Sequence, residues 1–145
     1  MADMHKHHPL SGPIPGARIL LAAALLFAAA VQAAPLLRCQ VSYSGETRTL
    51  EAAPVSDPYS VGAWDIGGRF RFKAVVIGDE CRIDYIKLYA YYQAERQPVL
   101  LHEAKYLPPF AVSDAPYALT GLNYLYSPDL GRELQYGCAL DGVHP

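Results

Sequence analysis

Two stretches rich in β-forming residues, separated by a short polar break, place the strongest constraint on the fold of this chain. Residues 69–78 alternate basic and apolar side chains, and residues 81–92 are dense in Tyr and Ile. Successive side chains of a strand point to opposite faces, so the first stretch has one apolar and one basic face. The two stretches predict a long β-hairpin around which the rest of the chain is built. A helix over residues 83–97 is the alternative, and the density of Tyr and Ile argues against it.

The apolar face of this hairpin selects its register. A two-residue loop at Asp79 and Glu80 mixes apolar and basic side chains, because a one-residue slip inverts every side chain. A three-residue loop from Asp79 to Cys81, with Gly78 relaxing the turn, keeps one face apolar. The pairs on that face are Phe70 with Ala90, Phe72 with Leu88 and Ala74 with Ile86, and Val76 extends it. We predict the three-residue loop, with this face in the core.

The opposite face of the hairpin is a candidate binding surface. The predicted register sets three pairs side by side: Arg69 with Tyr91, Arg71 with Tyr89 and, less favourably, Lys73 with Lys87. A guanidinium over a phenol ring contributes ~0.5–1 kcal/mol when exposed. Arg and Tyr are also enriched at protein interfaces, which favours a contact surface. The alternative is the solvated outer face of an ordinary hairpin.

Residues 1–33 have the pattern of a secretory signal peptide. Lys6 and Arg18 form a basic flank, and residues 19–30 are all Ile, Leu, Ala or Phe. Small residues follow at the positions a signal peptidase reads, and the apolar run is short for a membrane span. We predict cleavage after Ala33, with an uncleaved N-terminal anchor as the alternative. The expected location is the periplasm or the exterior, without stable membrane insertion.

Residues 34–145 then form one predicted domain. Loss of Lys6, Arg18 and Asp3 changes the formal net charge from −2 to about −3, which gives no reason to expect nucleic acid. All 11 Tyr lie in this part, and such a composition suits a β-sheet. Further strands are predicted over residues 36–43, 47–53, 98–107 and 133–141, with connections over 54–68 and 106–130. The fold class is therefore all-β, a small antiparallel β-sandwich of six to eight strands.

A short internal repeat favours two sheets. Residues 55–59 recur, with one inserted residue, at 112–117, and residues 65–67 recur at 129–131. The offset of 64 residues between 65–67 and 129–131 also aligns inward positions of the hairpin with those of the last strand. The aligned pairs are Phe70 with Leu134, Phe72 with Tyr136, Ala74 with Cys138 and Val76 with Leu140. Each half then has a Ser/Asp turn, an extended Pro-Tyr segment and an Asp-x-Gly turn that enters a core strand. Chance is the alternative explanation.

Tyr136-Gly137-Cys138 resembles the corner of the immunoglobulin fold, in which a Tyr lies two residues before a Cys. The resemblance covers three residues. The spacings that separate Cys39, Trp64 and Cys138 are too long for that family. The resemblance implies an immunoglobulin-like architecture as one form of the sandwich and carries no function.

Three cysteines in an exported chain predict one disulfide and one remaining thiol. Cys39 and Cys138 both lie on the apolar side of a predicted strand, and the chain ends of a domain often lie close together. We therefore predict a Cys39–Cys138 disulfide. Cys81 lies at the predicted hairpin tip and is left as a free or intermolecular thiol. Pairing of Cys81 with either other cysteine is the alternative.

The sequence contains no hydrolase, phosphate-loop or zinc motif. Outside the leader it has two histidines, His102 in a predicted strand and His144 near the end of the chain. Two histidines do not make the usual zinc cluster without carboxylates. We predict no catalytic residue, no metal and no cofactor, with His102 as a structural residue.

These observations predict a non-enzymatic binding or assembly module of the cell envelope that has a protein partner. Its candidate binding residues are Arg69, Arg71, Tyr89, Tyr91, Phe110 and Tyr117, the last two from the loop 108–117. One alternative is a small periplasmic hydrolase that uses His102 with acidic residues. Another is a structural subunit of an envelope complex, joined through its edge strands.

Overall fold

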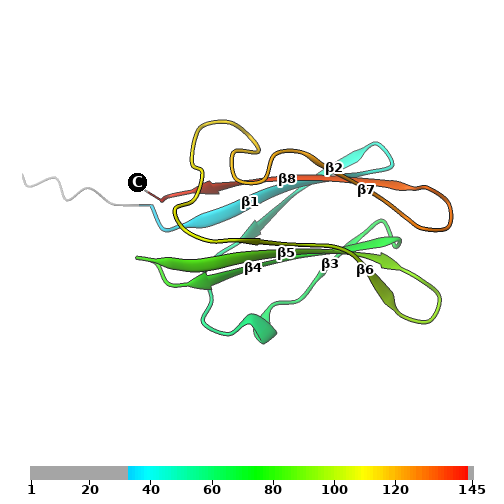
Figure 1. The fold of residues 1–145 in the computed structure, drawn as a ribbon, viewed down its shortest axis with the longest axis horizontal. Helices are drawn as coiled ribbons and strands as arrows, with labels where there is room; N and C mark the ends of the chain where they lie inside the picture. Colours follow the sequence, from blue (N-terminus) through cyan, green and yellow to red (C-terminus); the bar gives the residue numbers. More distant parts are fainter. Residues whose placement is uncertain (1–32, 144–145) are drawn as a thin grey trace, which may run out of the picture. The chain divides into compact units, whose positions relative to one another are not determined.

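The computed structural model describes residues 33–143, which form two antiparallel sheets of four strands each (Figure 1). The first sheet has the order β2-β1-β8-β7 and the second β3-β4-β5-β6. The elements in chain order are β1 Leu36–Tyr43, β2 Glu46–Ala52, the 3-10 helix η1 Pro58–Ser60, β3 Trp64–Ile66, β4 Phe70–Gly78, β5 Ile83–Gln93, β6 Pro98–Tyr106, β7 Asn123–Tyr126 and β8 Glu133–Asp141. The predicted small β-sandwich is confirmed. The predicted signal peptide lies, apart from Ala33, outside the described residues.

The core lies between the two sheets and is built from alternate residues of each central strand. Phe70, Phe72, Ala74 and Val76 of β4 are buried, as the sequence predicted. The ring of Phe72 lies over that of Tyr136 in β8, with centroids 5.0 Å apart. Complete burial of each large apolar side chain stabilises the fold by ~1.5–3 kcal/mol, so these two strands hold the sheets together.

The predicted hairpin exists, but its register was wrong by two residues. Phe72 pairs with Ala90 instead of Leu88. The loop is longer because the Asp79 carboxylate accepts the backbone N–H groups of Cys81 and Arg82, both at 2.8 Å. The backbone N–H of Asp79 also donates to the carbonyl of Arg82 at 2.9 Å, which closes a four-residue turn. An even shift preserves the faces, so the apolar face remains in the core.

Gly78 does serve the turn, as predicted. Its φ is +149°, and a Cβ there would collide with the backbone of Arg82. The register shifts by one residue between Ile77 and Gly78, which is a β-bulge at the end of the hairpin. Bulges of this kind re-aim the strand and its turn.

Two short edge strands were missed by the sequence prediction. β3 has three residues and pairs with the start of β4 through a tight turn at residues 67–69. β7 has four residues and pairs with the start of β8. Segments this short have too few residues for a period-2 pattern to identify them. They are strands because a long, buried neighbour offers a free row of hydrogen-bonding groups.

The predicted Cys39–Cys138 disulfide is present. Both cysteines lie in the first sheet, on the adjacent strands β1 and β8. This differs from the immunoglobulin arrangement, in which the bond joins the two sheets. The start of β1 and the end of β8 also pair, with Leu36 opposite Asp141, so the two ends of the described sandwich are neighbours.

The two sheets have the same internal order once the chain is followed as a circle. β3-β4-β5-β6 corresponds to β7-β8-β1-β2, and every neighbouring pair is antiparallel. The connections that precede β3 and β7 are also alike, because each donates a backbone hydrogen bond to the long strand that follows the edge strand. The N–H of Val55 donates to the carbonyl of Val76 in β4 at 2.9 Å, and that of Leu119 donates to Cys138 in β8 at 3.1 Å. The inward positions that the sequence repeat aligned are all buried.

Candidate functional site

The outer face of the second sheet carries tyrosine and basic side chains, as the alternation of β4 and β5 predicted. The outward cross-strand pairs include Arg71 with Tyr91 and with Asp65 of β3, Lys73 with Tyr89, Lys87 with Lys105 and Tyr89 with Glu103. Each basic residue of β4 therefore faces a tyrosine, and the predicted Lys73–Lys87 pair does not form. We call Arg71, Lys73, Tyr85, Lys87, Tyr89, Tyr91 and Lys105 the basic tyrosine face.

Lys87 is the best-anchored cation on this face. Its Nζ lies 2.7 Å from Oε1 of Glu103 and 5.6 Å from the ring centroid of Tyr89. The hydrogen bond to Glu103 holds the pKa of Lys87 above its ordinary value, so the ammonium remains charged at neutral pH. Lys105 likewise lies over Tyr85, with its Nζ 4.8 Å from the ring centroid. These cation–π contacts hold lysine side chains across the sheet.

The tyrosines of this face form a partly buried row. The rings of Tyr89 and Tyr91 stack with centroids 6.2 Å apart and an interplanar angle of 15°. Burial raises the pKa of Tyr91 above its ordinary value, so its hydroxyl stays protonated. Stacked rings present a stiff apolar surface at little entropic cost, which is useful in a contact surface.

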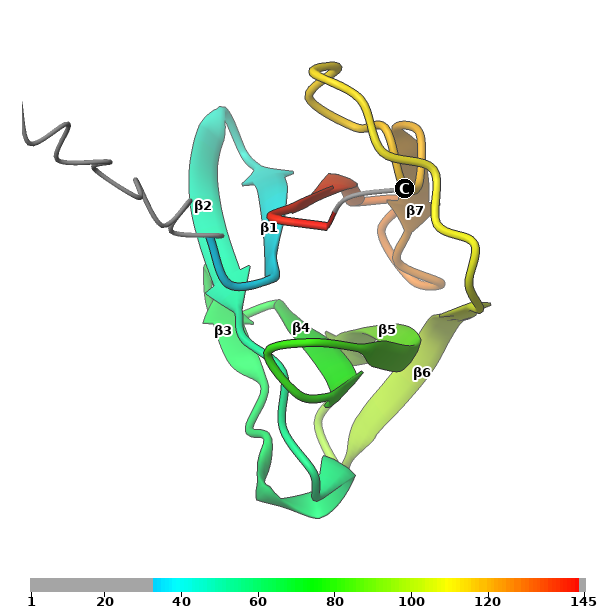
Figure 2. The same cartoon turned by 90° about the vertical axis from the view of Figure 1, so that its left-hand side faces the viewer.

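The connection between β2 and β3 covers part of the face and shapes a hollow. Figure 2 shows this connection, with η1, on the side of the second sheet that faces away from the first sheet. η1 forms because Oδ1 of Asp57 accepts the N–H of Tyr59 at 2.9 Å and Pro58 occupies the first turn. The sequence repeat had marked these residues as a turn, but no sequence signal indicated that they fold over β4.

The hollow has a volume of about 230 Å³ and is both apolar and basic. The lining includes Val75 of β4, which is only 2% exposed although it points outward, because η1 lies over β4. Tyr85, Tyr89, Lys73 and Lys87 also line the hollow. The lining also includes Pro58 and Tyr59, and Tyr59 is 92% exposed. We call this the Val75 hollow.

Arg69 does not pair with Tyr91 as the sequence predicted. It lies in the turn before β4, where its carbonyl accepts the N–H of Gln93 at 2.8 Å. The two-residue register shift places Arg69 beyond the paired tyrosines. Of the predicted set, Arg71, Tyr89 and Tyr91 therefore lie together on this outer face, and Arg69 does not.

Phe110 and Tyr117 lie elsewhere and are both half-buried. Phe110 packs against the hydrophobic core. Tyr117 packs on the first sheet, where its hydroxyl donates to Oε1 of Gln40 at 2.9 Å. Its ring occupies the space that a Cβ at Gly137 would need. These two aromatic side chains therefore tie the loop 107–122 to the sandwich, and they do not join the basic tyrosine face.

His102 lies in β6, half-buried and opposite Ala90. Its ring centroid is 5.9 Å from that of Tyr136. The adjacent Glu103 points to the outer face, where it binds Lys87, because neighbouring side chains of a strand point to opposite faces. Within residues 33–143 no group of three or more His, Cys, Asp or Glu side chains is arranged to hold a metal ion.

Cys81 lies in the turn between β4 and β5 and is exposed, and among the described cysteines it has no disulfide partner.

None of the described helices is long and apolar enough to cross a membrane. Comparison with known protein families, curated protein sequences and solved structures finds no match for this chain.

Proposed function

We propose that this protein is an exported, non-catalytic binding or assembly module of the cell envelope that binds an acidic protein segment on its basic tyrosine face. The observation that carries the proposal is the Val75 hollow, in which a buried apolar side chain lies between tyrosines and two lysines. The Cys39–Cys138 disulfide supports export, because such bonds persist in oxidising compartments.

The charge of the face indicates the chemistry of the partner. Arg71, Lys73, Lys87 and Lys105 are outward cations on β4, β5 and β6. Two acidic residues lie beside them, Asp65 of β3 opposite Arg71 and Glu103 against Lys87, so the cations are in excess. The chain as a whole has a net charge of −2, so the positive charge of this face is local. Complementary charge steers association and sets the choice of partner. An acidic segment therefore fits the face better than a basic or neutral one.

The Val75 hollow gives that segment an anchor. An apolar side chain placed in this hollow would contact the tyrosines that surround the covered Val75, while a neighbouring carboxylate reaches Lys73 or Lys87. Anchors of this kind, aromatic and desolvated at the centre with charge at the rim, carry most of the affinity of protein interfaces. The expected ligand is an extended segment with one aromatic or aliphatic residue flanked by Asp or Glu.

The test is selection from a displayed peptide library, followed by affinity measurement on the selected peptides. We expect acidic peptides with one apolar anchor, whose binding weakens with salt. Lys73→Glu should weaken binding at least tenfold. Arg96→Glu is the matched control, since it changes the net charge equally at an exposed turn outside the face. Equal losses in the two variants, or selection of basic or neutral peptides, would contradict the proposal.

The non-catalytic part of the proposal has its own test. The purified protein is assayed on ester, peptide and glycoside substrates, with His102→Ala as the comparison. We expect no turnover by either protein. Turnover that disappears in His102→Ala would support the hydrolase alternative in place of a binding module.

A further inference from the structure

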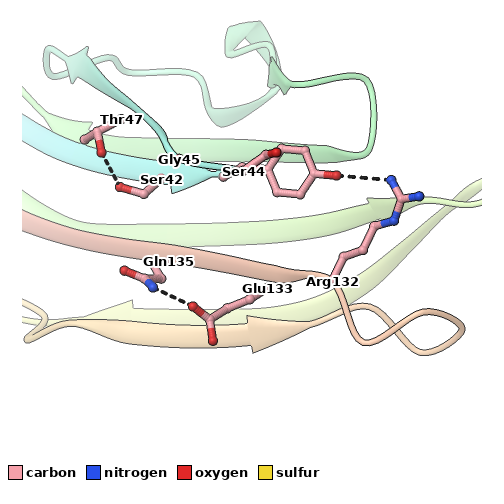
Figure 3. Close-up of a pocket in the computed structure, with 8 residues that line it drawn as sticks. Ser42, Ser44, Gly45, Thr47, Arg132, Glu133 and Gln135 are labelled. Atoms are coloured by element: carbon pink, nitrogen blue, oxygen red, sulfur yellow. Dashed lines mark hydrogen bonds between the residues drawn. The ribbon is translucent and has the colours of Figure 1, made fainter.

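The outer face of the first sheet contains a second depression, built from different chemistry (Figure 3). It has a volume of about 650 Å³ and lies beside the turn between β1 and β2. Ser42 and Thr47 line one side, and Glu133 and Gln135 line the other, with Arg132 at its end (Figure 3). We call this depression, defined by these five residues, the polar trough.

The polar trough follows a row of outward residues that crosses all four strands of the first sheet. Thr47 of β2 pairs with Ser42 of β1, Ser42 with Gln135 of β8, and Gln135 with Tyr124 of β7. Neighbouring strands are ~4.8 Å apart, so three steps give a row of ~14 Å. The row therefore offers a series of hydrogen-bonding groups that ends at an aromatic ring.

The polar groups of the trough are held in place by one another. The hydroxyls of Ser42 and Thr47 are 2.7 Å apart. The Gln135 amide donates to Oε1 of Glu133, and the hydroxyl of Tyr126 donates to Oε2 of the same carboxylate at 2.7 Å. Hydrogen bonds from the Gln135 amide, which has the larger effect, and from the Tyr126 hydroxyl hold the pKa of Glu133 below its ordinary value. The Glu133 carboxylate therefore acts as a fixed acceptor. Such preorganisation reduces the entropy that a ligand must overcome.

Two exposed tyrosines border the trough on β7. Tyr124 is 52% exposed and Tyr126 is 56% exposed, and both lie on the outer face, two residues apart. Exposed rings beside hydroxyl, amide and carboxylate groups suit a ligand that has both flat C–H surfaces and many hydroxyls. The two charges of the trough, on Arg132 and Glu133, are of opposite sign. A neutral ligand therefore fits this site better than an anion.

We propose that the polar trough binds a neutral oligosaccharide. The hydroxyls of Ser42 and Thr47 and the amide of Gln135 donate to and accept from sugar hydroxyls, Glu133 accepts, and Arg132 donates. Tyr124 stacks on the face of a sugar ring at the end of the row. The volume is within the range of small-ligand sites. Most such sites have an apolar lining, whereas the polar lining of this one suits a hydroxyl-rich ligand. The site is on the outer face of the opposite sheet from the basic tyrosine face.

The experiment uses immobilised hexasaccharides of neutral sugars, namely cellohexaose, chitohexaose and maltohexaose, with an oligogalacturonate as the anionic comparison. We expect at least one neutral probe to bind better than the anionic one. Tyr124→Ala and Gln135→Ala should each weaken that binding by about fivefold or more, the size of a lost stacking or polar contact. Tyr124→Phe keeps the ring and should retain most of the binding.

Lys73→Glu is the control that separates the two proposed sites, because it changes the opposite outer face. It should leave oligosaccharide binding unchanged, and Tyr124→Ala should leave peptide binding unchanged. Both tyrosine variants alter a half-exposed side chain, and thermal unfolding confirms that they are folded. Absence of binding to all three neutral probes, preference for the anionic probe, or equal binding by Tyr124→Ala would overturn the proposal.

Discussion

Cys39 of β1 and Cys138 of β8 lie directly opposite each other on neighbouring strands, with Cα atoms 4.0 Å apart and a disulfide between them. Both side chains are buried in the core between the sheets. The bond joins residues separated by 99 positions in the sequence. It therefore fixes the pairing of β1 with β8. This pairing joins the two strands of the first sheet that are farthest apart in the sequence.

Removal of this disulfide should destabilise the protein strongly. The Cys39→Ala/Cys138→Ala variant should lose about 2–4 kcal/mol of unfolding free energy, and the loop model gives an upper value of about 4.7 kcal/mol for a loop of this size. Urea denaturation measures the change. Cys81→Ala is the control and should have little effect, because Cys81 is exposed and unpaired in the described structure. Peptide mapping without reduction that links Cys81 to another cysteine would contradict the pairing.

Phe72 and Arg71 are adjacent in sequence but should differ greatly in their effect on stability. Phe72→Ala should cost ~3–5 kcal/mol, because its ring is fully buried against Tyr136. Arg71→Ala should cost less than about 1 kcal/mol, because Arg71 is exposed on the basic tyrosine face. Denaturation midpoints of the two variants decide the question, and equal losses would contradict the assignment of faces.

The hydroxyl of Tyr136 is buried and has no hydrogen-bond partner among the described residues. Burial also raises the pKa of Tyr136, so the phenol stays neutral. Tyr136→Phe should therefore leave the unfolding free energy unchanged or raise it, because a buried unpaired polar group is costly. Tyr136→Ala should instead cost ~3–5 kcal/mol. A clear loss of stability in Tyr136→Phe would show that the hydroxyl has a stabilising partner.

The turn between β4 and β5 should respond to acid through Asp79. The backbone N–H groups of Cys81 and Arg82 hold the pKa of Asp79 below its ordinary value of 3.8. Its folded-state pKa is lower than its unfolded pKa. Its contribution to stability is therefore present above about pH 4 and is lost as the pH falls through the folded value. NMR titration should give a midpoint below 3.8, with the amides of Cys81 and Arg82 shifting in the same step.

Asp79→Asn provides the control for this titration, since the amide oxygen still accepts a hydrogen bond but does not ionise in this range. The step in the Cys81 and Arg82 amide shifts should disappear in this variant. A midpoint at or above 3.8 in the wild-type protein would show that the turn hydrogen bonds do not favour the carboxylate.

The sequence by itself determined the features that depend on local alternation. β1 and β8 have the predicted bounds, and Phe70 and Phe72 point inward as their period-2 pattern requires. The disulfide followed from two inward cysteines on the first and last strands. These predictions hold because the direction of a side chain on a strand is set by its position in the chain.

Tertiary structure alone decided the hairpin register, the short strands β3 and β7, the Val75 hollow and the polar trough. The register depends on how the Asp79 carboxylate closes its turn, and β3 and β7 exist because long strands offer them free hydrogen-bonding edges. The Val75 hollow requires η1 to fold over β4. The row from Thr47 to Tyr124 unites four strands, and its members become neighbours only when β1 and β8 pair across the length of the chain. Contacts between distant segments depend on the free energy of the whole fold, and no local pattern encodes them.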